Sequence, residues 1–476
     1  MRARPGPAIT AGAQPAPEDA PMRPPDDPAL AAIRLGFGLS PRLAPPADLA
    51  GVLAGVADAA RPDGWTRDEA TAAIIRLDDA RKARDAGRLD PAGYKALADA
   101  IDQQRLVVLQ RRIARALDAP SGFGERLVQF WADHFTTVPQ NPPQHLLAAA
   151  LVDEAIRPNL GGRLGDMVVA AVTHPMMLVY LNQTSSVGPN SRAAIRRSRE
   201  RLGLNENLAR EVLELHTLGV GAPYAQGDVR ALAELFTGLS FNPRNPVPYR
   251  PQMAEPGAET VLGRRYGGDD RDGLAEIARA LGDLAAAPAT AAHLARKLAI
   301  HFAADDPPAG LVEDLAATLR GSGGDLAQVN AVLAGHPDLG ATFRAKARQP
   351  FDFVVAGLRA LGVTGAEVLA LVPPDANRLL WAPLARMGQP FVRARGPDGW
   401  PEAAADWITP QTLAARIDWA LRVPARFVDP LPDPRALIDT ALGGSASEAL
   451  AAAVPRAETV REGVALVLAS TDFNRR

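Results

Sequence analysis

The sequence predicts an all-α protein, and three observations support this class. After Pro28, hydrophobic residues recur at the spacing of amphipathic helices in nearly every segment. Runs in which β-branched residues alternate with polar ones, as in half-buried strands, are almost absent. Short breaks separate the segments, and no repeat of fixed period relates them. We therefore expect one large domain of packed antiparallel helices, not a helical-repeat solenoid.

The first 27 residues differ in composition from the rest of the chain. Pro and Ala dominate MRARPGPAITAGAQPAPEDAPMRPPDD, which has few large apolar side chains from which to build a core. The segment also lacks the apolar stretch of a secretory signal and the paired arginines of twin-arginine export. Residues 1–27 are therefore predicted to be a disordered leader, with Met22 as an alternative start. The missing signal predicts a cytoplasmic protein.

The helices are predicted in chain order from spacing and capping residues. RLGFGLSP at 34–41 is interpreted as a turn between helices. Residues 66–84 begin with Thr66, a helix-capping residue, followed by acidic residues in the first turn. Residues 94–119 repeat leucine and isoleucine at helical spacing and form the longest helix. Further helices are predicted at 125–135, 144–156, 205–217, 228–237, 272–284, 289–302, 311–319, 325–333, 351–361, 410–421, 434–442 and 458–469.

One internal segment, residues 242–273, is both polar and rich in Pro and Gly. It is predicted to be a long loop or a linker. It separates a helical half at 28–241, which holds the main polar cluster, from a second helical half at 274–476. Both halves belong to one continuous domain at 28–476, in a chain long enough for two or three hydrophobic cores.

Composition and missing motifs exclude several classes of function. The net charge is -2, with 52 basic and 54 acidic residues, so no global field attracts nucleic acid or anionic lipid. The absence of cysteine excludes disulfides, thiolate metal sites and a cysteine nucleophile. No stretch approaches the ~20 apolar residues of a membrane span. The motifs GxxxxGK[ST], HExxH and GxSxG are absent, as is GxGxxG after a strand, which disfavours nucleotide, zinc-protease, esterase and dinucleotide sites.

The strongest candidate site is NENLAREVLELHTLGV, residues 205–220, which contains three carboxylates, an arginine, two asparagines and a histidine. On a helical wheel Leu208 and Val212 lie on a hydrophobic stripe. Glu211 and Glu214 lie together on its shoulder, with Arg210 beside them. If this shoulder is exposed, it carries only weak ion pairs. If another helix covers it, the buried carboxylates must be paired or ligated, and they can then serve as acid, base or metal ligand.

A second candidate is ERLVQFWADHFT, residues 125–136. His134 shares an apolar helix face with Trp131, so it is either a core histidine bonded to a carbonyl or carboxylate, or a ligand or base. Asp133 points to another side, where it could cap or pair. A run of arginines is either a solvated face or a site for phosphate or carboxylate. It consists of Arg192, Arg196, Arg197, Arg199 and Arg201.

Several segments follow one another in the order found in a known family. They include RLGFGLSP at 34–41, FWADHFT at 130–136, NENLAREVLELHTLGV with YAQGDVRALAELFTG at 205–238, LARKLAIHF at 294–302 and GQPFVRARGPDGWPEAAADWITP at 388–410. Together they resemble the bacterial family called domain of unknown function 1800, over residues 30–474. The resemblance implies a single large helical domain without an established reaction. It also implies that many members are exported, to the periplasm or beyond, and that their partner has an alkaline-phosphatase-like fold.

The chain departs from this family pattern in one loop. Relatives usually carry a His and a Lys in a loop of the form H-[DE]-x-G-x-K-x-x-L-G, where AEPGAETVLG here has Ala254 and Glu259. If that histidine is a ligand or base in relatives, part of their chemistry is missing from this chain, or the chain is a binding paralogue.

These observations predict a polar pocket between helices, formed by FWADHFT and NENLAREVLELHT, with acid/base or metal-assisted hydrolytic chemistry. The predicted catalytic residues are Glu211, Glu214, His134 and Arg210, and the predicted substrate-binding residues are Asn205, Glu206 and Asn207. The predicted ligands of a divalent metal, such as Mg, Mn, Fe or Zn, are His216, His134 and Glu211. The alternative is a non-enzymatic scaffold that binds a protein partner and whose polar block fixes helix register.

Overall fold

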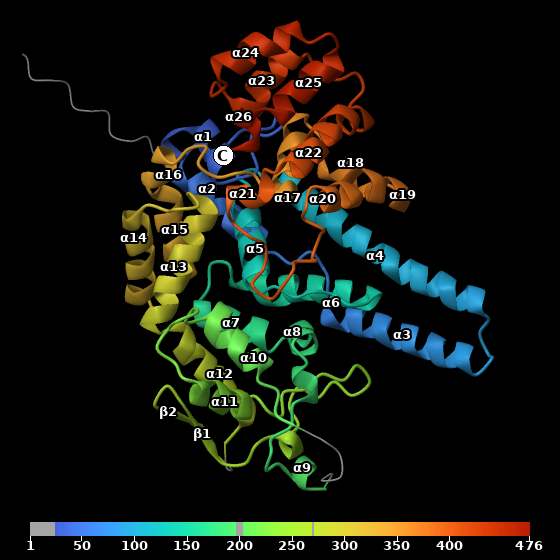
Figure 1. The fold of residues 1–476 in the computed structure, drawn as a ribbon, viewed down its shortest axis with the longest axis vertical. Helices are drawn as coiled ribbons and strands as arrows, with labels where there is room; N and C mark the ends of the chain where they lie inside the picture. Colours follow the sequence, from blue (N-terminus) through green and yellow to red (C-terminus); the bar gives the residue numbers. More distant parts are fainter. Residues whose placement is uncertain (1–23, 197–202, 269–270) are drawn as a thin grey trace, which may run out of the picture.

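The computed structural model describes residues 24–196, 203–268 and 271–476, and these residues are almost entirely helical (Figure 1). The predicted all-α class is therefore confirmed. The helices before the hairpin are α1 (Pro28–Arg34), α2 (Leu49–Ala59), α3 (Arg67–Asp85), α4 (Pro91–Asp118), α5 (Phe123–His134), α6 (Pro142–Leu151), α7 (Leu164–Val172), α8 (Pro175–Tyr180), α9 (Arg192–Arg196), α10 (Asn207–Glu211) and α11 (Gln226–Leu235). The hairpin strands are β1 (Ala258–Val261) and β2 (Arg264–Gly267).

The helices after the hairpin complete the fold. They are α12 (Gly273–Ala285), α13 (Pro288–Phe302), α14 (Ala309–Gly321), α15 (Leu326–Gly335), α16 (Asp338–Ala341), α17 (Pro350–Ala360), α18 (Gly365–Leu369), α19 (Pro373–Ala376), α20 (Ala382–Arg386), α21 (Ala404–Trp407), α22 (Pro410–Arg422), α23 (Pro434–Leu442), α24 (Glu448–Ala453), α25 (Val460–Ala469) and α26 (Thr471–Asn474). Helices α22 to α26 gather at one end of the molecule, α7 to α12 and the hairpin lie at the other, and α13 to α15 run along one side (Figure 1).

Residues 1–23 of the predicted leader at 1–27 lie outside the described residues. Its last residues are structured: Pro24–Asp26 form a 3₁₀ turn. Asp27 then caps α1 by accepting the backbone N–H groups of Ala29 and Leu30 at 2.8 and 3.1 Å. A capping carboxylate satisfies N–H groups that the first turn of a helix leaves unpaired, so α1 begins with Pro28 directly after its cap.

Two hydrophobic clusters form the interior. The first includes residues of α2, α5 to α8 and α10 to α15, from both sides of the segment at 242–273, such as Leu232 and Ile277. The second joins the C-terminal half of α4 to α17, α20, α22, α23 and α25, with Phe353 and Trp419 in edge-to-face contact. Helix α4 contributes to both clusters, with Val108 in the first and Leu109 in the second, so it lies where they meet. The division of the chain at 242–273 stays a prediction, although part of that segment forms the hairpin of β1 and β2.

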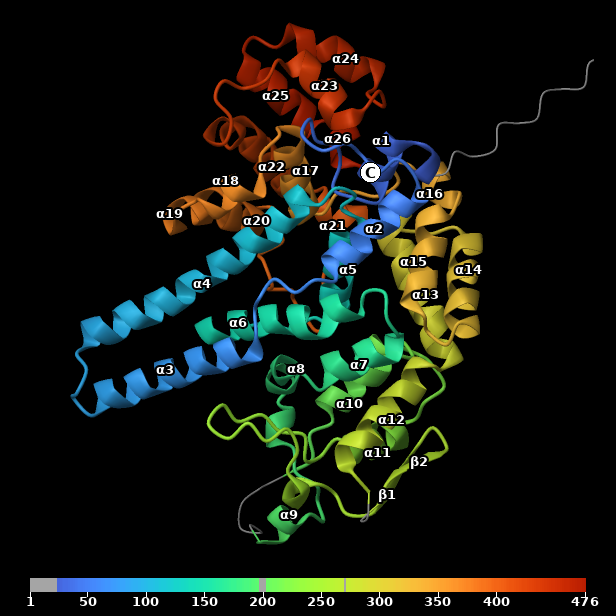
Figure 2. The same cartoon turned by 180° about the vertical axis from the view of Figure 1, so that it is seen from behind.

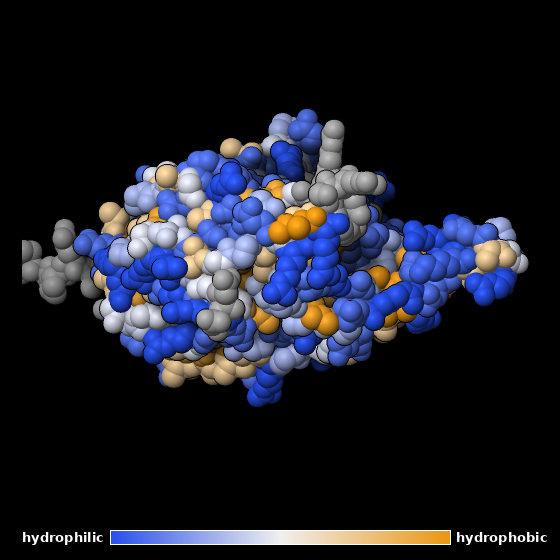
Figure 3. Space-filling view, turned by 90° about the horizontal axis from the view of Figure 1, so that it is seen from below, coloured by the Kyte–Doolittle hydropathy of each residue, from blue (hydrophilic) through white to orange (hydrophobic). Residues whose placement is uncertain are grey.

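Helices α3 and α4 extend side by side from the body as an arm, which is visible from both sides (Figures 1 and 2). Both helices pack on α6 at the base of the arm. Seen from below, the surface is mostly hydrophilic with small separate hydrophobic areas (Figure 3). Within the described residues, no helix is both long enough and apolar enough to cross a lipid bilayer.

The predicted capping role of Thr66 is present at the start of α3. The Thr66 hydroxyl accepts the Glu69 N–H at 3.2 Å, and the Glu69 carboxylate accepts the Thr66 N–H at 3.2 Å. We expect Thr66→Ala to lower the free energy of unfolding by about 1 kcal/mol, because both donors lose their partners. Chemical denaturation measures this loss, and Thr71→Ala, a substitution inside the same helix, is the matched control. Equal effects of the two substitutions would contradict the capping role.

In the part of the chain that the structure describes, three helices contain a π-helical segment, which the sequence pattern did not predict. These segments are Val152–Ile156, Val212–His216 and Asn377–Trp381. A π turn holds more residues than an α turn and rotates the side chains that follow it. The second of them continues α10 through the predicted polar cluster and therefore changes where His216 points.

Candidate active site

A cavity of about 110 Å³ lies where the two hydrophobic clusters meet. Its walls come from α4, α5, α6, α17 and α20, from His301 on α13, and from residues 389–400. Val108 and Leu151 on its wall belong to the first cluster, and Ala116 and Leu384 belong to the second. Polar side chains also face it, and this mixture of apolar walls with a few polar groups is typical of ligand sites. The polar members include Arg112, Glu125, Gln129, Asp133, Thr136, Thr137, His301, Gln349 and Gln389.

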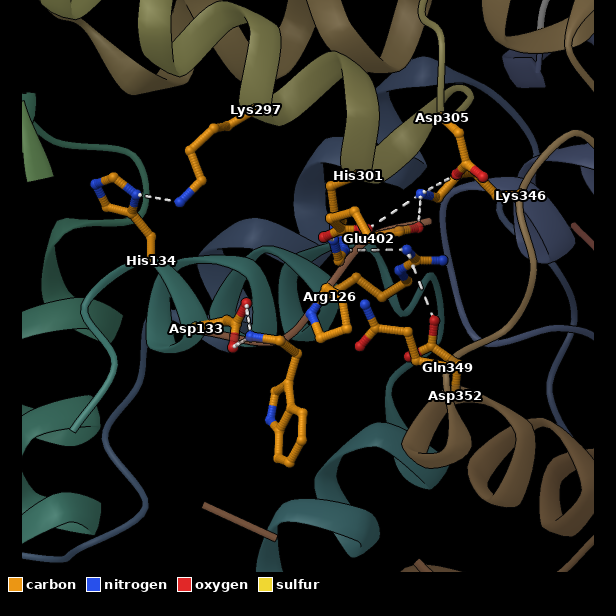
Figure 4. A network of polar contacts seen from close by, with 12 residues as sticks. Arg126, Asp133, His134, Lys297, His301, Asp305, Lys346, Gln349, Asp352 and Glu402 are labelled. Atoms are coloured by element: carbon orange, nitrogen blue, oxygen red, sulfur yellow. Dashed lines mark hydrogen bonds and ion pairs between the residues drawn. The ribbon is translucent and has the colours of Figure 1, made fainter. Parts of the chain in front are cut away.

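Asp133, in the last turn of α5, lies on the cavity wall and is half-buried. The backbone N–H of Trp400 donates to both of its carboxylate oxygens, at 3.0 and 3.2 Å (Figure 4). Burial raises the pKa of Asp133 to about 7; the Trp400 N–H opposes this rise and the Glu402 carboxylate adds to it. Asp133 is therefore close to half protonated at neutral pH.

Gly399 permits the contact between Asp133 and Trp400. Its φ is +85°, in the left-handed region that favours glycine. A Cβ atom at this position would lie 2.7 Å from Asp133 Oδ2 and 2.8 Å from the Asp133 carbonyl oxygen. The loop that carries Trp400 reaches Asp133 because residue 399 has no side chain.

His134 and Lys297 form a pair behind Asp133 (Figure 4). His134 is buried, and its Nε2 lies 3.2 Å from the carbonyl oxygen of His216. A carbonyl only accepts, so Nε2 carries the proton and Nδ1 accepts from the Lys297 amino group at 3.1 Å. Burial lowers the pKa of His134 well below its usual value, and Lys297 lowers it further. His134 is therefore neutral and orients Lys297.

Lys297 itself is held among carboxylates. Burial lowers the pKa of Lys297, whereas Asp133, Glu402 and Asp398 act in the opposite direction. The half-buried Lys297 thus lies near Asp133 and favours the charged form of that carboxyl group.

His301 lines the same cavity, but both of its ring nitrogens have partners. Nδ1 lies 2.6 Å from Glu402 Oε1, and Nε2 lies 3.2 Å from a guanidinium nitrogen of Arg126. The guanidinium only donates, so Nε2 is the acceptor and Nδ1–H donates to Glu402. Lys346 pairs with Glu402 at 3.2 Å and with Asp305 at 2.8 Å. His301 therefore supports the cavity wall and is not free to transfer protons.

The predicted cluster at 205–220 forms a partly exposed network away from this cavity. Arg210 pairs with Glu214 at 3.2 Å and with Glu206 at 3.5 Å, and its side chain is 39% exposed. Gln226 on α11 connects Arg210 and Glu206 at 3.1 and 2.8 Å. Asn205 donates to the Leu181 carbonyl at 2.8 Å. Asn207 is exposed on the first turn of α10.

Glu211 is half-buried. Burial raises the pKa of Glu211, the carboxylates of Glu214 and Asp398 add to the rise, and Arg210 opposes it. Neither Glu211 nor Glu214 is among the residues that line the 110 Å³ cavity.

The structure does not bring the predicted metal ligands together. Both ring nitrogens of His134 are hydrogen-bonded to protein groups, and both ring nitrogens of His216 are buried without a hydrogen-bond partner among the described residues. Across residues 24–196, 203–268 and 271–476, no group of three or more His, Asp or Glu side chains is arranged to hold a metal ion. His134 and His216 nevertheless lie together, with ring centroids 5.9 Å apart.

The family model described as protein of unknown function (DUF1800) matches residues 30–475, nearly the whole chain. The chain belongs to the DUF1800 family. Neither a curated protein nor a solved structure matches it. Membership in DUF1800 confirms the resemblance found in the sequence and leaves the reaction to be inferred from the site.

The segment AEPGAETVLG, which the resemblance predicts to differ from the pattern of relatives, leads into the hairpin. Glu259 is on β1, which packs on α11. Burial raises the pKa of Glu259 to about 7, and the neighbouring carboxylates of Glu234 and Glu255 add to the rise. Neither Ala254 nor Glu259 lines the cavity. In the basic run, Arg192 and Arg196 are exposed on α9, and Arg197, Arg199 and Arg201 lie outside the described residues.

Sequence reasoning missed Asp133 and Lys297 as members of the site. Asp133 is adjacent to His134 in the sequence, but the two side chains point to different sides of α5. Lys297 is adjacent to Arg296 in a helix that was assigned no role. The available signal was GPDGW at 396–400, in which a glycine precedes the tryptophan whose N–H binds Asp133.

Proposed function

We propose that the protein is an enzyme that performs acid/base chemistry of the hydrolytic kind, with Asp133 as the group that transfers protons. The observation that carries this proposal is a half-buried carboxyl group on the wall of a cavity, held by the Trp400 N–H, with a pKa of about 7. A general acid or base is most effective when its pKa is close to the working pH. Asp133 meets this condition at neutral pH.

The surrounding residues each contribute to this role. The Trp400 N–H fixes the direction of the carboxylate, and Gly399 makes that contact sterically allowed. Lys297, oriented by neutral His134, stabilises the carboxylate after it has given up its proton. In the ionised form Asp133 can take a proton from a water molecule in the cavity, and in the protonated form it can give one to a leaving group.

This proposal assigns the reacting carboxyl group to Asp133 and not to Glu211 or Glu214. Those two residues do not line the cavity, and they pair with, or lie beside, Arg210. His134 keeps a role, but as a residue that positions Lys297. No step of the proposal needs a metal ion.

A screen of ester, amide and phosphoester substrates with the native chain, measured between pH 5 and 9, tests the proposal. We expect turnover whose rate follows one titration near pH 7, and we expect Asp133→Asn to lack that turnover. Asp418→Asn, at a surface ion pair on α22, is the matched control. Equal turnover in the native chain and in Asp133→Asn would exclude Asp133 as the reacting group.

Removing the charge of Lys297 is expected to shift the titration in the rate profile to higher pH. In Lys297→Met the Asp133 carboxylate loses a cation that favours its ionised form, so its pKa rises further. Lys297→Arg keeps the charge and should stay closer to the native profile. A profile that does not move in Lys297→Met would show that Lys297 does not act on Asp133.

A further inference from the structure

Arg112, on α4, is a half-buried cation on the cavity wall. Within the described residues it forms neither a hydrogen bond nor an ion pair with a protein group. Burial and the neighbouring Arg157 together lower the pKa of Arg112 to about 10, although the carboxylates of Glu125, Asp153 and Asp63 oppose this, so the guanidinium is charged at pH 7. Removing a charge from water costs free energy unless the charge is paired. Arg112 is therefore suited to bind an anion.

The nearest carboxylate is already occupied by other arginines. Glu125 accepts two hydrogen bonds from Arg157, at 2.8 and 2.9 Å, and a third from Arg115 at 2.9 Å. This buried Glu125 group satisfies Arg157 and Arg115 and leaves Arg112 without a bond. Arg112 is therefore available to a molecule that enters the cavity.

A second polar group on the cavity wall also lacks a hydrogen-bond partner. It is an acceptor that needs a donor, whereas Arg112 is a donor that needs an acceptor. Gln129 Oε1 is buried and accepts no hydrogen bond within the described part of the chain. Gln129 precedes Asp133 by four residues on α5, so the two side chains share one helix face toward the cavity. The cavity thus presents a cation, an acceptor that needs a donor, and the proposed proton-transferring carboxyl group.

We infer that this cavity binds a small monocarboxylate that also carries a hydroxyl or amino group, with the carboxylate on Arg112 and the donor on Gln129 Oε1. The inference rests on the proposed function insofar as Asp133 then acts on the bound molecule. A cavity of about 150 Å³ holds benzene, so 110 Å³ suits about five non-hydrogen atoms, or the end of a longer molecule. A doubly charged phosphate is disfavoured because Asp133 and Glu125 line the same cavity.

Calorimetric titration of the native chain with glycolate, acetate, glycolamide and inorganic phosphate tests this ligand class. Glycolate carries both groups, acetate lacks the donor, and glycolamide lacks the charge. We expect glycolate to bind at least tenfold more tightly than glycolamide and several-fold more tightly than acetate. Phosphate should bind more weakly than glycolate. Glycolamide binding as tightly as glycolate, preferred binding of phosphate, or no binding of glycolate at millimolar concentration would each overturn the inference.

Variants separate this inference from the proposed reaction. Arg112→Gln should lose glycolate binding, Arg112→Lys should keep part of it, and Arg111→Gln on the same helix should bind as the native chain does. Asp133→Asn should retain glycolate binding although it lacks turnover. Native affinity in both folded Arg112 variants would overturn the ligand assignment and leave the role of Asp133 intact. Turnover that persists in Asp133→Asn, together with loss of binding in Arg112→Gln, would exclude the reaction mechanism and support the ligand class.

Discussion

Replacing Asp133 by asparagine is expected to abolish turnover and, at the same time, to make the folded protein more stable above pH 7. General acid/base groups contribute roughly 10²- to 10⁴-fold to rates, so a loss of that size is expected in kcat/KM. Asparagine keeps the size of aspartate and an oxygen that accepts the Trp400 N–H. The substitution therefore removes the titration and preserves the contact.

The gain in stability follows from the direction of the pKa shift. In the folded chain the pKa of Asp133 is raised from 3.8 to about 7, so the folded state holds the proton more tightly than the unfolded state. The stability from this group is complete below pH 3.8, decreases as the pH rises from 3.8 to 7, and is fully lost above pH 7. Asparagine avoids that loss, which is at most about 4 kcal/mol for a shift of this size and smaller because the group is half-buried.

Melting temperatures of the native chain and of Asp133→Asn, measured between pH 4 and 9, check this prediction. The two should be similar near pH 4, the variant should become progressively more stable than the native chain as the pH rises from 4 to 7, and the difference should stay constant above pH 7. A variant that is less stable than the native chain at every pH would indicate that Asp133 is a structural residue. Greater stability combined with lost activity is typical of a functional group held in an unfavourable environment.

The helical pattern predicted the fold class and most of the long helices because each depends on local spacing. In the segment at 205–220 it also identified the buried face, since Leu208 and Val212 are both fully buried. It did not predict the π turn at residues 212–216, because the wheel assumes an α-helix throughout. His216, at the end of this turn, is buried beside His134.

The site could not be found from local pattern, since its contacts join distant parts of the chain. Asp133 meets Trp400 across 267 residues, and His134 meets Lys297 across 163. Helical periodicity carries no information about such pairs. Polar density in the sequence drew attention to residues 205–214, where Arg210 neutralises its neighbours at the surface. The less polar FWADHFT segment instead provides Asp133. Burial raises the pKa of this carboxyl group to about 7.

Gly399→Ala is expected to destabilise the fold strongly and to disturb the site, because the new methyl group would lie too close to three atoms of Asp133. The added Cβ would lie 2.7 Å from Oδ2, 2.8 Å from Cγ and 2.8 Å from the carbonyl oxygen of Asp133. The last of these is backbone, so a rotamer change of Asp133 does not relieve it and the loop must move. A loss of roughly 2 to 4 kcal/mol is expected from overpacking and backbone strain together.

Gly64→Ala separates the backbone strain at a positive φ from the overpacking against Asp133. Gly64 has a similar φ of +92°, but no atom lies within 4 Å of an added Cβ, so this variant measures the backbone strain alone, about 1 kcal/mol. Chemical denaturation of both variants should show the larger loss in Gly399→Ala. Movement of the loop also withdraws the Trp400 N–H from Asp133, which raises the pKa of that carboxyl group further and shifts the rate profile to higher pH. Equal losses in the two variants, with an unshifted profile, would mean that Gly399 does not set the approach of Trp400 to Asp133.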